Sequence, residues 1–230
     1  MIVKLKHKRG EIVYRYFFKR VIDIVLALTA LPFWLIILII VGPIIYFEDK
    51  GSIFYNAPRL GKDGKIFKMY KFRSMRVNAA DIRNEDGSTF NSEEDPRLTR
   101  IGKIIRKISL DETPQLLNVI KGDMSIVGPR PDLPEHQGLY EGTEKRKLEI
   151  RPGVTGYNQA YYRNTAPWKE RIQHDIYYID HLSLGFDIRI LVKTAISVLK
   201  REDIYVTGTL KEMQGQDKKL EADLGGCDSL

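Results

Sequence analysis

A long uncharged segment constrains this chain more than any other feature. Among its 230 residues, the 24 from Ile24 to Phe47 contain no charged side chain. A straight helix of that length reaches about 36 Å, enough to cross a hydrocarbon core of about 30 Å. A core helix that is apolar on every face is rare in a domain of this size, and no small-residue cleavage site follows, as a signal peptide would require. The sequence therefore predicts one membrane helix over residues 21–47.

Positive charge is concentrated on both sides of this helix. The chain has a net charge of +7, to which residues 1–20 contribute +6 and residues 48–80 contribute +5. A spanning helix is basic mainly on its cytoplasmic side, whereas both flanks are basic here, and Pro32 interrupts the run by removing a backbone donor. These features favour a re-entrant helix, broken at Pro32, over a spanning one. Asp23 is expected to be held at the interface near Lys19 or Arg20, one helical turn away, without a role in function.

The charge distribution also restricts the partners. Residues 81–230 sum to −3, whereas a nucleic-acid-binding protein usually carries basic residues over its folded domain. We therefore expect that the protein does not bind nucleic acid. We expect its basic residues to contact the acidic phospholipids of the inner leaflet. The only cysteine is Cys227, which excludes a disulfide scaffold. A mean hydropathy of −0.28 excludes a multi-pass membrane protein.

Outside the membrane helix, the sequence predicts a mostly helical α+β fold. Residues 51–76 are typical of a hairpin with its turn at 61–64, and residues 78–96 are typical of a mobile polar surface loop. Two short helices are expected at 98–108 and 110–121. A periodic pattern over 167–200 predicts one long helix, which either covers the core, the favoured interpretation, or lies along the membrane interface.

Four regions follow from these patterns. They are a basic juxtamembrane segment at 1–20, the membrane helix at 21–47, a cytoplasmic domain at 48–205 and a polar, disordered tail at 206–230.

The strongest candidate for chemistry is the pair Asp111 and Glu112. One interpretation is structural, because Ser109 and Glu112 have the spacing of a capping box and Pro114 suits a first helical turn. The other is catalytic: a carboxylate at a helix N-terminus stays ionised, an ionised Asp can attack phosphorus, and paired carboxylates with substrate phosphates hold Mg²⁺. The spacing alone leaves both interpretations open.

Cationic residues near this pair favour the catalytic interpretation. Arg130 stands between Pro129 and Pro131, so a stiff loop would hold its guanidinium for phosphate binding. Lys71 and Arg73 form a second cationic set, and Arg163 follows a tight loop at 151–156. The spacing of His and Cys residues makes a zinc-type site improbable, and no phosphate-binding glycine motif is present.

In order along the chain, these motifs resemble those of the bacterial polyprenyl-phosphate sugar-1-phosphate transferases, also called monotopic phosphoglycosyl transferases. The apolar segment is followed by KFRSM at 71–75, SLDETPQLLNVIKGDMSIVGPRP at 109–131, RPGVTGYNQ at 151–159 and RN at 163–164. The similarity covers residues 15–205, and its motifs are long and specific. The chain is similar to the minimal form of the family, without additional N-terminal spans.

The resemblance implies a reaction and a set of roles. A UDP-sugar donates sugar-1-phosphate to undecaprenyl phosphate and UMP is released, which initiates assembly of a surface polysaccharide or glycoconjugate. Asp111 matches the family's nucleophile, which forms a phosphosugar intermediate, and Glu112 completes a dyad that binds Mg²⁺. The residues expected to bind phosphate or shape the site are Lys71, Arg73, Arg106, Arg130, Arg163 and Asp187.

The resemblance also implies a location: the bacterial inner membrane, with a re-entrant helix and a catalytic domain that faces the cytoplasm. A homodimer is a further expectation. Three positions depart from the family pattern: Leu31 replaces the serine before the proline, Ala57 replaces the glutamine of Gln-x-Arg, and Tyr162 replaces a glycine. Because Leu31 has no hydroxyl, Thr29 is expected to support the bend of the helix. The alternative function is a non-catalytic membrane-anchored adaptor, which would release no UMP.

Overall fold

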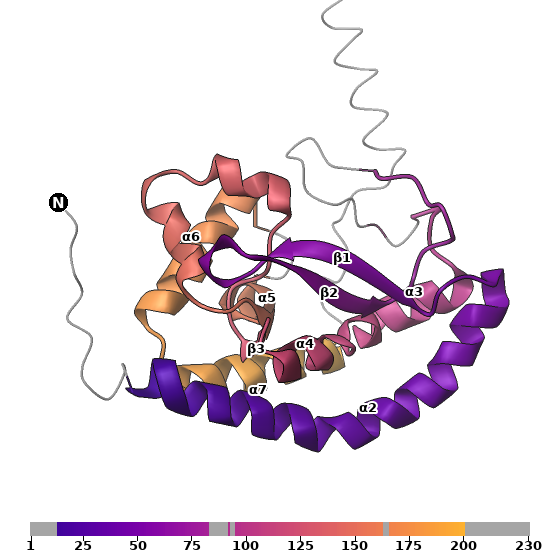
Figure 1. The fold of residues 1–230 in the computed structure, drawn as a ribbon, viewed down its shortest axis with the longest axis horizontal. Helices are drawn as coiled ribbons and strands as arrows, with labels where there is room; N and C mark the ends of the chain where they lie inside the picture. The colour runs from indigo at the N-terminus through magenta and orange to yellow at the C-terminus, as the bar shows by residue number, and fades with distance from the viewer. Residues whose placement is uncertain (1–12, 83–91, 93–94, 163–165, 201–230) are drawn as a thin grey trace, which may run out of the picture.

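The computed structural model describes residues 13–82, 92, 95–162 and 166–200. Helices dominate, and the strands form two small two-stranded sheets (Figure 1), so the predicted α+β, mostly helical fold is confirmed. The helices are α2 (Lys19–Asp49), α3 (Arg100–Lys107), α4 (Gln115–Lys121), α5 (Tyr157–Tyr161), α6 (Trp168–Asp180) and α7 (Leu184–Lys200). The strands are β1 (Phe54–Leu60), β2 (Ile66–Phe72), β3 (Ser125–Val127) and β4 (Gly153–Thr155). Shorter helical turns are η1 (Tyr14–Phe18), η2 (Lys62–Gly64), η3 (Leu110–Glu112), η4 (Pro134–Leu139) and η5 (Gly142–Glu149).

The apolar helix α2 is curved but not broken. It continues through Pro32 and Pro43 and forms a wide arc with the other elements on its concave side (Figure 1). The predicted interruption at Pro32 is therefore wrong, because the bend is distributed along the helix. Thr29 donates its hydroxyl to the carbonyl of Val25 at 2.8 Å, not to that of Leu28, which Pro32 leaves without its helical donor. Such a bond to the preceding turn itself bends a helix.

Within the described residues, the helical stretch from Tyr14 to Asp49 is the one that is long and apolar enough to cross a membrane. Its concave face packs inward through Ala27, Trp34, Val41 and Ile45. Most of its other large apolar side chains are exposed, including Phe33, Ile36, Ile39, Ile40 and Phe47. A folded domain does not ordinarily leave so much apolar surface to water.

The first turns of α2 are fixed to the domain by charged side chains. Asp23 accepts hydrogen bonds from the Ser125 hydroxyl at 2.7 Å and the Ile126 amide at 2.9 Å. Lys19 contacts Asp187 instead, at 2.7 Å, and Arg20 donates to backbone carbonyls of α4. Lys19 and Arg20 still act electrostatically on Asp23, as expected from their proximity, but the hydrogen-bond partners of Asp23 lie in the folded domain.

The predicted hairpin is confirmed. Strands β1 and β2 pair antiparallel, with Phe54 opposite Phe72 and Leu60 opposite Ile66, and Gly64 supplies a positive φ of 73° in the turn. The helix predicted at 98–108 is α3. The second predicted helix, 110–121, is instead divided into η3 and α4.

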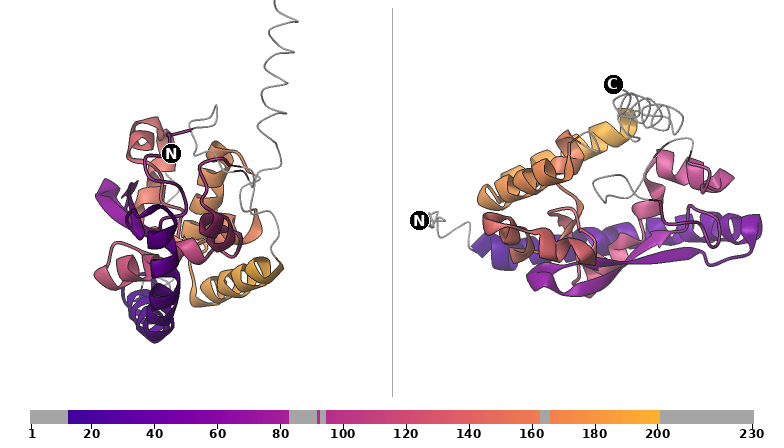
Figure 2. Two further views of the ribbon diagram at one scale, coloured as in Figure 1. Left: turned by 90° about the vertical axis from the view of Figure 1, so that its right-hand side faces the viewer. Right: turned by 90° about the horizontal axis from the view of Figure 1, so that it is seen from above.

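The helix predicted over 167–200 is two helices, α6 and α7. The chain turns at His181–Ser183, where Leu182 is buried in the core and the Ser183 hydroxyl accepts from the Phe186 amide at 3.3 Å, as a cap for α7. Helix α7 buries Ile190 against the core, as favoured, but leaves a second apolar stripe exposed: Leu184, Ile188, Val192, Ile196 and Leu199. Figures 1 and 2 place α7 beside the first half of α2 at the same face of the domain.

The expected surface loop at 78–96 lies mostly outside the described residues. In its described part, Asn78, Ala80 and Asp81 are exposed, as expected of a surface loop, whereas Ser92 and Asp95 are buried. Asp95 forms an ion pair with Arg97 at 2.7 Å, and this pair fixes the segment that leads into α3. The tail at 206–230 and Arg163 also lie outside the described residues.

Candidate active site

The dyad Asp111–Glu112 lies on a tight turn between α3 and α4. Ser109 adopts a left-handed conformation with φ of 56° and ψ of 23°, and its side chain makes no capping hydrogen bond. The predicted capping box is therefore wrong, because Glu112 does not reach back to Ser109 but contacts Lys71. A non-glycine residue in this conformation is strained, and such strain is concentrated at functional sites. The capping box therefore does not explain the two carboxylates, although Pro114 does stand at the start of α4 as expected.

The two carboxylates have opposite electrostatic environments. Burial raises the pKa of Asp111 to about 6, and the charge of Glu112 adds to this rise although Lys71 and Arg106 oppose it. Burial also disfavours the charged form of Glu112, but Lys71, Arg130 and Arg106 outweigh it and hold the pKa of Glu112 well below its usual range. The expectation that a helix N-terminus keeps Asp111 ionised is therefore too simple, because burial exceeds the influence of a three-residue turn.

Three cations reach this pair from three different elements. Lys71, at the end of β2, places its ammonium 2.5 Å from a carboxylate oxygen of Glu112. Arg106, in the last turn of α3, donates to the Ser74 hydroxyl at 3.0 Å and acts electrostatically on both carboxylates. Arg130, on the loop after β3, acts on Glu112. The structure therefore brings together the dyad and three of the six residues predicted to bind phosphate or shape the site.

Two other predicted site residues have partners elsewhere. The Arg73 guanidinium lies 2.5 Å from an oxygen of Asp49 at the end of α2. Asp187 accepts hydrogen bonds from Tyr14, Lys19 and Tyr178 at 2.6, 2.7 and 2.6 Å. In the structure, Arg73 and Asp187 fix the two ends of α2 to the domain, so the contacts that they make are architectural.

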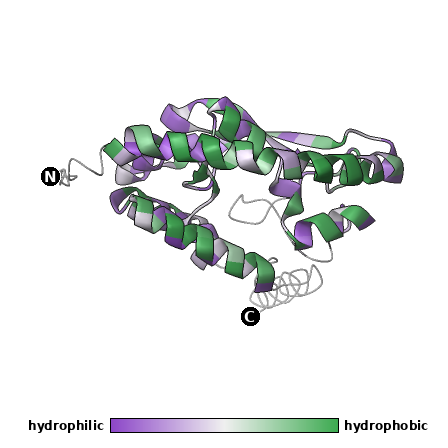
Figure 3. Cartoon of the chain, turned by 90° about the horizontal axis from the view of Figure 1, so that it is seen from below, coloured by the Kyte–Doolittle hydropathy of each residue, from purple (hydrophilic) through white to green (hydrophobic). Residues whose placement is uncertain are grey.

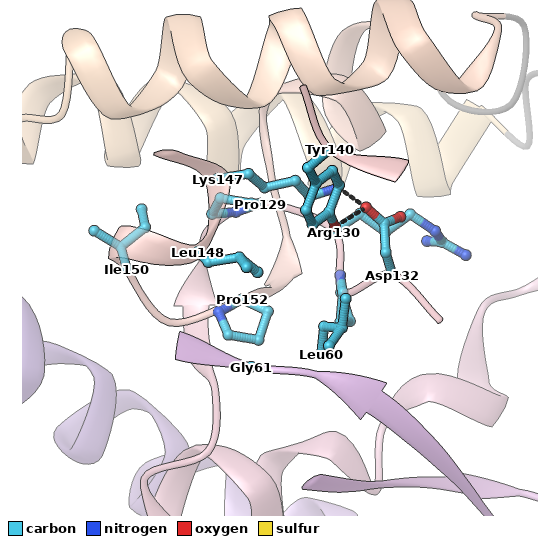
Figure 4. Close-up of a pocket in the computed structure, with 11 residues that line it drawn as sticks. Leu60, Gly61, Pro129, Arg130, Asp132, Tyr140, Lys147, Leu148, Ile150 and Pro152 are labelled. Atoms are coloured by element: carbon cyan, nitrogen blue, oxygen red, sulfur yellow. Dashed lines mark hydrogen bonds and ion pairs between the residues drawn. The ribbon is translucent and has the colours of Figure 1, made fainter. Parts of the chain in front are cut away.

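A buried charge cluster beside Arg130 has no counterpart in the sequence-based prediction. Asp132, Tyr140 and Lys147 surround a small pocket that Arg130 also lines (Figure 4), and Asp175 contacts Lys147 from α6. These residues are distant in sequence and match no spacing rule. The only available signal was that Asp132 follows Arg130 by two residues.

Among the described residues, no group of three or more His, Cys, Asp or Glu side chains could hold a metal ion. A divalent cation at this site would therefore depend on Asp111 and Glu112. The dyad fits Mg²⁺, which proteins commonly bind through one or two carboxylates together with substrate phosphates. A cation would also favour the ionised form of Asp111, which burial disfavours.

Comparison with known proteins agrees with this geometry. The model of a family described as bacterial sugar transferase matches residues 14–201. Galactosyl transferase CpsE of Streptococcus agalactiae is 42% identical in an alignment of 189 residues that covers 79% of this chain and 42% of CpsE. Undecaprenyl-phosphate galactose phosphotransferase of Salmonella typhimurium is 39% identical in an alignment of 206 residues that covers 82% of this chain and 42% of that protein.

A third relative has a similar length. The uncharacterized sugar transferase EpsL of Bacillus subtilis is 38% identical over 189 residues, which cover 82% of this chain and 91% of EpsL. The chain thus spans less than half of CpsE but nearly all of EpsL. Because the family match includes α2, the dyad and its three cations, this chain belongs to the bacterial sugar transferase family.

Proposed function

We propose that the chain transfers a sugar-1-phosphate from a UDP-sugar to undecaprenyl phosphate, with release of UMP. The observation that carries this proposal is the buried nucleophile candidate Asp111, next to Glu112 and among Lys71, Arg106 and Arg130. Two relatives, a galactosyl transferase and an undecaprenyl-phosphate galactose phosphotransferase by name, support it. The transfer would initiate assembly of a surface polysaccharide or a related glycoconjugate.

The reaction has two balanced steps. A carboxylate oxygen of Asp111 attacks the phosphorus that bears the sugar, the bond from that phosphorus to the UMP oxygen breaks, and UMP leaves with the electron pair. A phosphate oxygen of undecaprenyl phosphate then attacks the same phosphorus and frees the carboxylate of Asp111. Burial favours this use of Asp111, because a carboxylate with few water contacts is a better nucleophile than a hydrated one.

The three cationic residues and the dyad are assigned to phosphate binding and to metal binding, respectively. Phosphoryl transfer depends mainly on positioning and charge neutralisation, so Lys71, Arg106 and Arg130 are assigned to the phosphate oxygens. Glu112 and Asp111 would hold Mg²⁺, which neutralises phosphate charge when bound. Glu112 suits this role because its low pKa keeps it ionised.

The shape of α2 and the exposed face of α7 support a one-sided position in the membrane. Both ends of α2 contact the domain on the concave side of the arc, and basic residues flank both ends. The apolar stripe of α7 lies at the same face, and Figure 3 shows apolar residues on both helices there. We assign α2 to a re-entrant position in the cytoplasmic leaflet, α7 to the interface and the remaining domain to the cytoplasm.

The pH profile of turnover is expected to follow Asp111. Its pKa is raised to about 6 and only its ionised form attacks phosphorus, so activity is present above that pH and is lost as the pH falls through it. The profile of kcat/KM from about pH 5 to about pH 8 measures this pKa in the free enzyme. Because a bound cation favours the ionised form of Asp111, the acid limb should move to lower pH as the Mg²⁺ concentration is raised. A rate that rises as the pH falls would contradict the assignment of Asp111 as nucleophile.

Replacement of Glu112 by glutamine is expected to slow turnover by about 10- to 100-fold and to raise the Mg²⁺ concentration that gives half-maximal rate. Removing its charge also removes one cause of the raised pKa of Asp111, so the acid limb of the pH profile should move to lower pH. Glu149→Gln is the matched control, because its side chain is partly exposed in an ion pair with Arg15. An unchanged Mg²⁺ response in Glu112→Gln would place Glu112 away from the metal.

The experiment that tests the proposed function is UMP release by the detergent-solubilised chain with Mg²⁺, undecaprenyl phosphate and a panel of UDP-sugars. Release with one donor, dependent on undecaprenyl phosphate for repeated turnover, is the expected result. No release from any donor by the folded protein would contradict the proposal and favour the adaptor alternative.

A further inference from the structure

A lysine is buried among acidic residues behind the loop that carries Arg130. The side chain of Lys147 is 4% exposed, and its ammonium lies 2.5 Å from Asp132 and 3.0 Å from Asp175. The Tyr140 hydroxyl donates a third contact, to Asp132 at 2.7 Å. Figure 4 shows Tyr140 and Lys147 converging on Asp132 beside Arg130. Charged groups of this kind are costly to bury and do not by themselves increase stability over an apolar core.

This cluster contacts the Arg130 loop at two points. Asp132, two residues after Arg130, is bound through its carboxylate by Lys147, and its carbonyl accepts from the Leu60 amide at 2.9 Å. The backbone amide of Arg130 itself favours the charged form of Asp175, together with Lys147. Lys147 therefore connects the carboxylate of Asp132, in the Arg130 loop, with that of Asp175, in α6.

The carboxylate of Asp175 depends on this arrangement. Burial raises its pKa to about 6, against the opposing effect of Lys147. Within the described residues, neither carboxylate oxygen of Asp175 has a hydrogen-bond partner of regular geometry, so its ion pair with Lys147 is its principal compensation. Without Lys147, Asp175 would bind a proton and Asp132 would lose its ion pair.

We propose that Lys147, with Asp132 and Asp175, is a positioning residue that fixes the Arg130 guanidinium toward the phosphates at the dyad. The proposal rests on the proposed function, in which Arg130 binds a substrate phosphate. Of the three cationic residues, Arg130 lies on an irregular loop, whereas Lys71 lies on a strand and Arg106 on a helix. A loop that must present a guanidinium accurately needs support from the residues behind it.

The neighbouring residue provides a matched control. Arg146 joins the same two elements, η5 and α6, through an ion pair with Asp180, but this pair does not contact the Arg130 loop. If Lys147 only connects η5 to α6, replacing Arg146 should have the same effect as replacing Lys147. If Lys147 positions Arg130, replacing Arg146 should have a much smaller effect.

The test is a double-mutant cycle measured by UMP release from the full chain, with the donor that the wild type accepts. Lys147→Met is expected to lower kcat/KM by about 10- to 100-fold, whereas Arg146→Met lowers it by about twofold or less. In the Arg130→Ala background, Lys147→Met is expected to cause little further loss, because the group that it positions is absent. Lys147→Arg, which keeps the charge, should recover part of the activity.

The outcomes separate this inference from the proposed function. Equal losses from Lys147→Met in both backgrounds, or equal effects of Lys147→Met and Arg146→Met, would overturn the positioning role while the function stands. A wild type that releases no UMP from any donor would overturn the proposed function and the positioning role with it. If circular dichroism shows that Lys147→Met does not fold, Asp175→Asn replaces it in the cycle, with the same expected loss and the same dependence on Arg130.

Discussion

Replacement of Asp111 by asparagine is expected to abolish turnover, with a loss of at least about 10³-fold. The amide has nearly the shape of the carboxylate but cannot attack phosphorus, so no covalent intermediate forms. Stability should be retained or increased, because burial already disfavours the charged form of Asp111 and the variant removes that charge. UMP release measures the first effect, and thermal unfolding in detergent measures the second.

Asp180→Asn is the control for this change, because Asp180 pairs with Arg146 away from the dyad and should retain turnover. Near-normal turnover in Asp111→Asn would mean that the carboxylate is not the nucleophile. A loss of turnover together with unfolding would also contradict the account, since it would show Asp111 to be structural.

The largest expected effect on stability is that of Asp187→Ala, which should lower the free energy of unfolding by about 3–5 kcal/mol. Asp187 is 5% exposed and accepts hydrogen bonds from Tyr14, Lys19 and Tyr178. Its removal takes the shared acceptor from the Lys19 ammonium and the Tyr14 hydroxyl and leaves the Tyr178 hydroxyl only its longer bond to the Val127 carbonyl at 3.3 Å, so the first turns of α2 lose this attachment to α7. Denaturant-induced unfolding in detergent measures the change.

Glu149→Ala is the comparison for Asp187→Ala. Glu149 also binds the region before α2, through Arg15, but its side chain is 42% exposed, and removal of such a pair costs about 1 kcal/mol or less. A variant Asp187→Asn that keeps its stability but loses activity would contradict the architectural role and would place Asp187 in the site, as the resemblance implied.

Local sequence patterns predicted those elements whose partners lie nearby along the chain. The hairpin of β1 and β2 follows from a strand, a glycine-containing turn and a second strand, and all of this information is local. The apolar run likewise predicted α2. Its curvature was not predicted correctly, because Pro32 removes a donor at one point whereas packing of the concave face bends the helix along its whole length.

The elements that were predicted wrongly are those whose structure depends on tertiary contacts. Ser109 and Glu112 have capping-box spacing, but Lys71 from a distant strand binds Glu112 instead. The periodicity over 167–200 continues across Leu182, so it did not reveal the turn that inserts this leucine into the core. In both cases the residues have the spacing that the pattern requires, but a contact with a residue distant in sequence stabilises a different local structure.

The residues of the candidate active site could be predicted when they belong to sequence motifs of the family. Asp111, Glu112 and Arg130 lie in one long segment that resembles a known family, and the structure adds that Lys71 and Arg106 reach the same carboxylates. The Lys147 cluster was not predictable, because Asp132, Lys147 and Asp175 come from a loop, a 3₁₀ segment and a helix that only the fold brings together.

The most direct test of the central claim omits the acceptor. The wild-type chain, Mg²⁺ and the preferred UDP-sugar are mixed without undecaprenyl phosphate, and UMP and the mass of the intact protein are measured together. The account predicts a burst of UMP that ends at one equivalent per active chain, with a mass increase of one sugar phosphate, and neither change in Asp111→Asn. Absence of a burst and of a mass increase in a preparation that turns over once undecaprenyl phosphate is added would contradict the covalent role of Asp111.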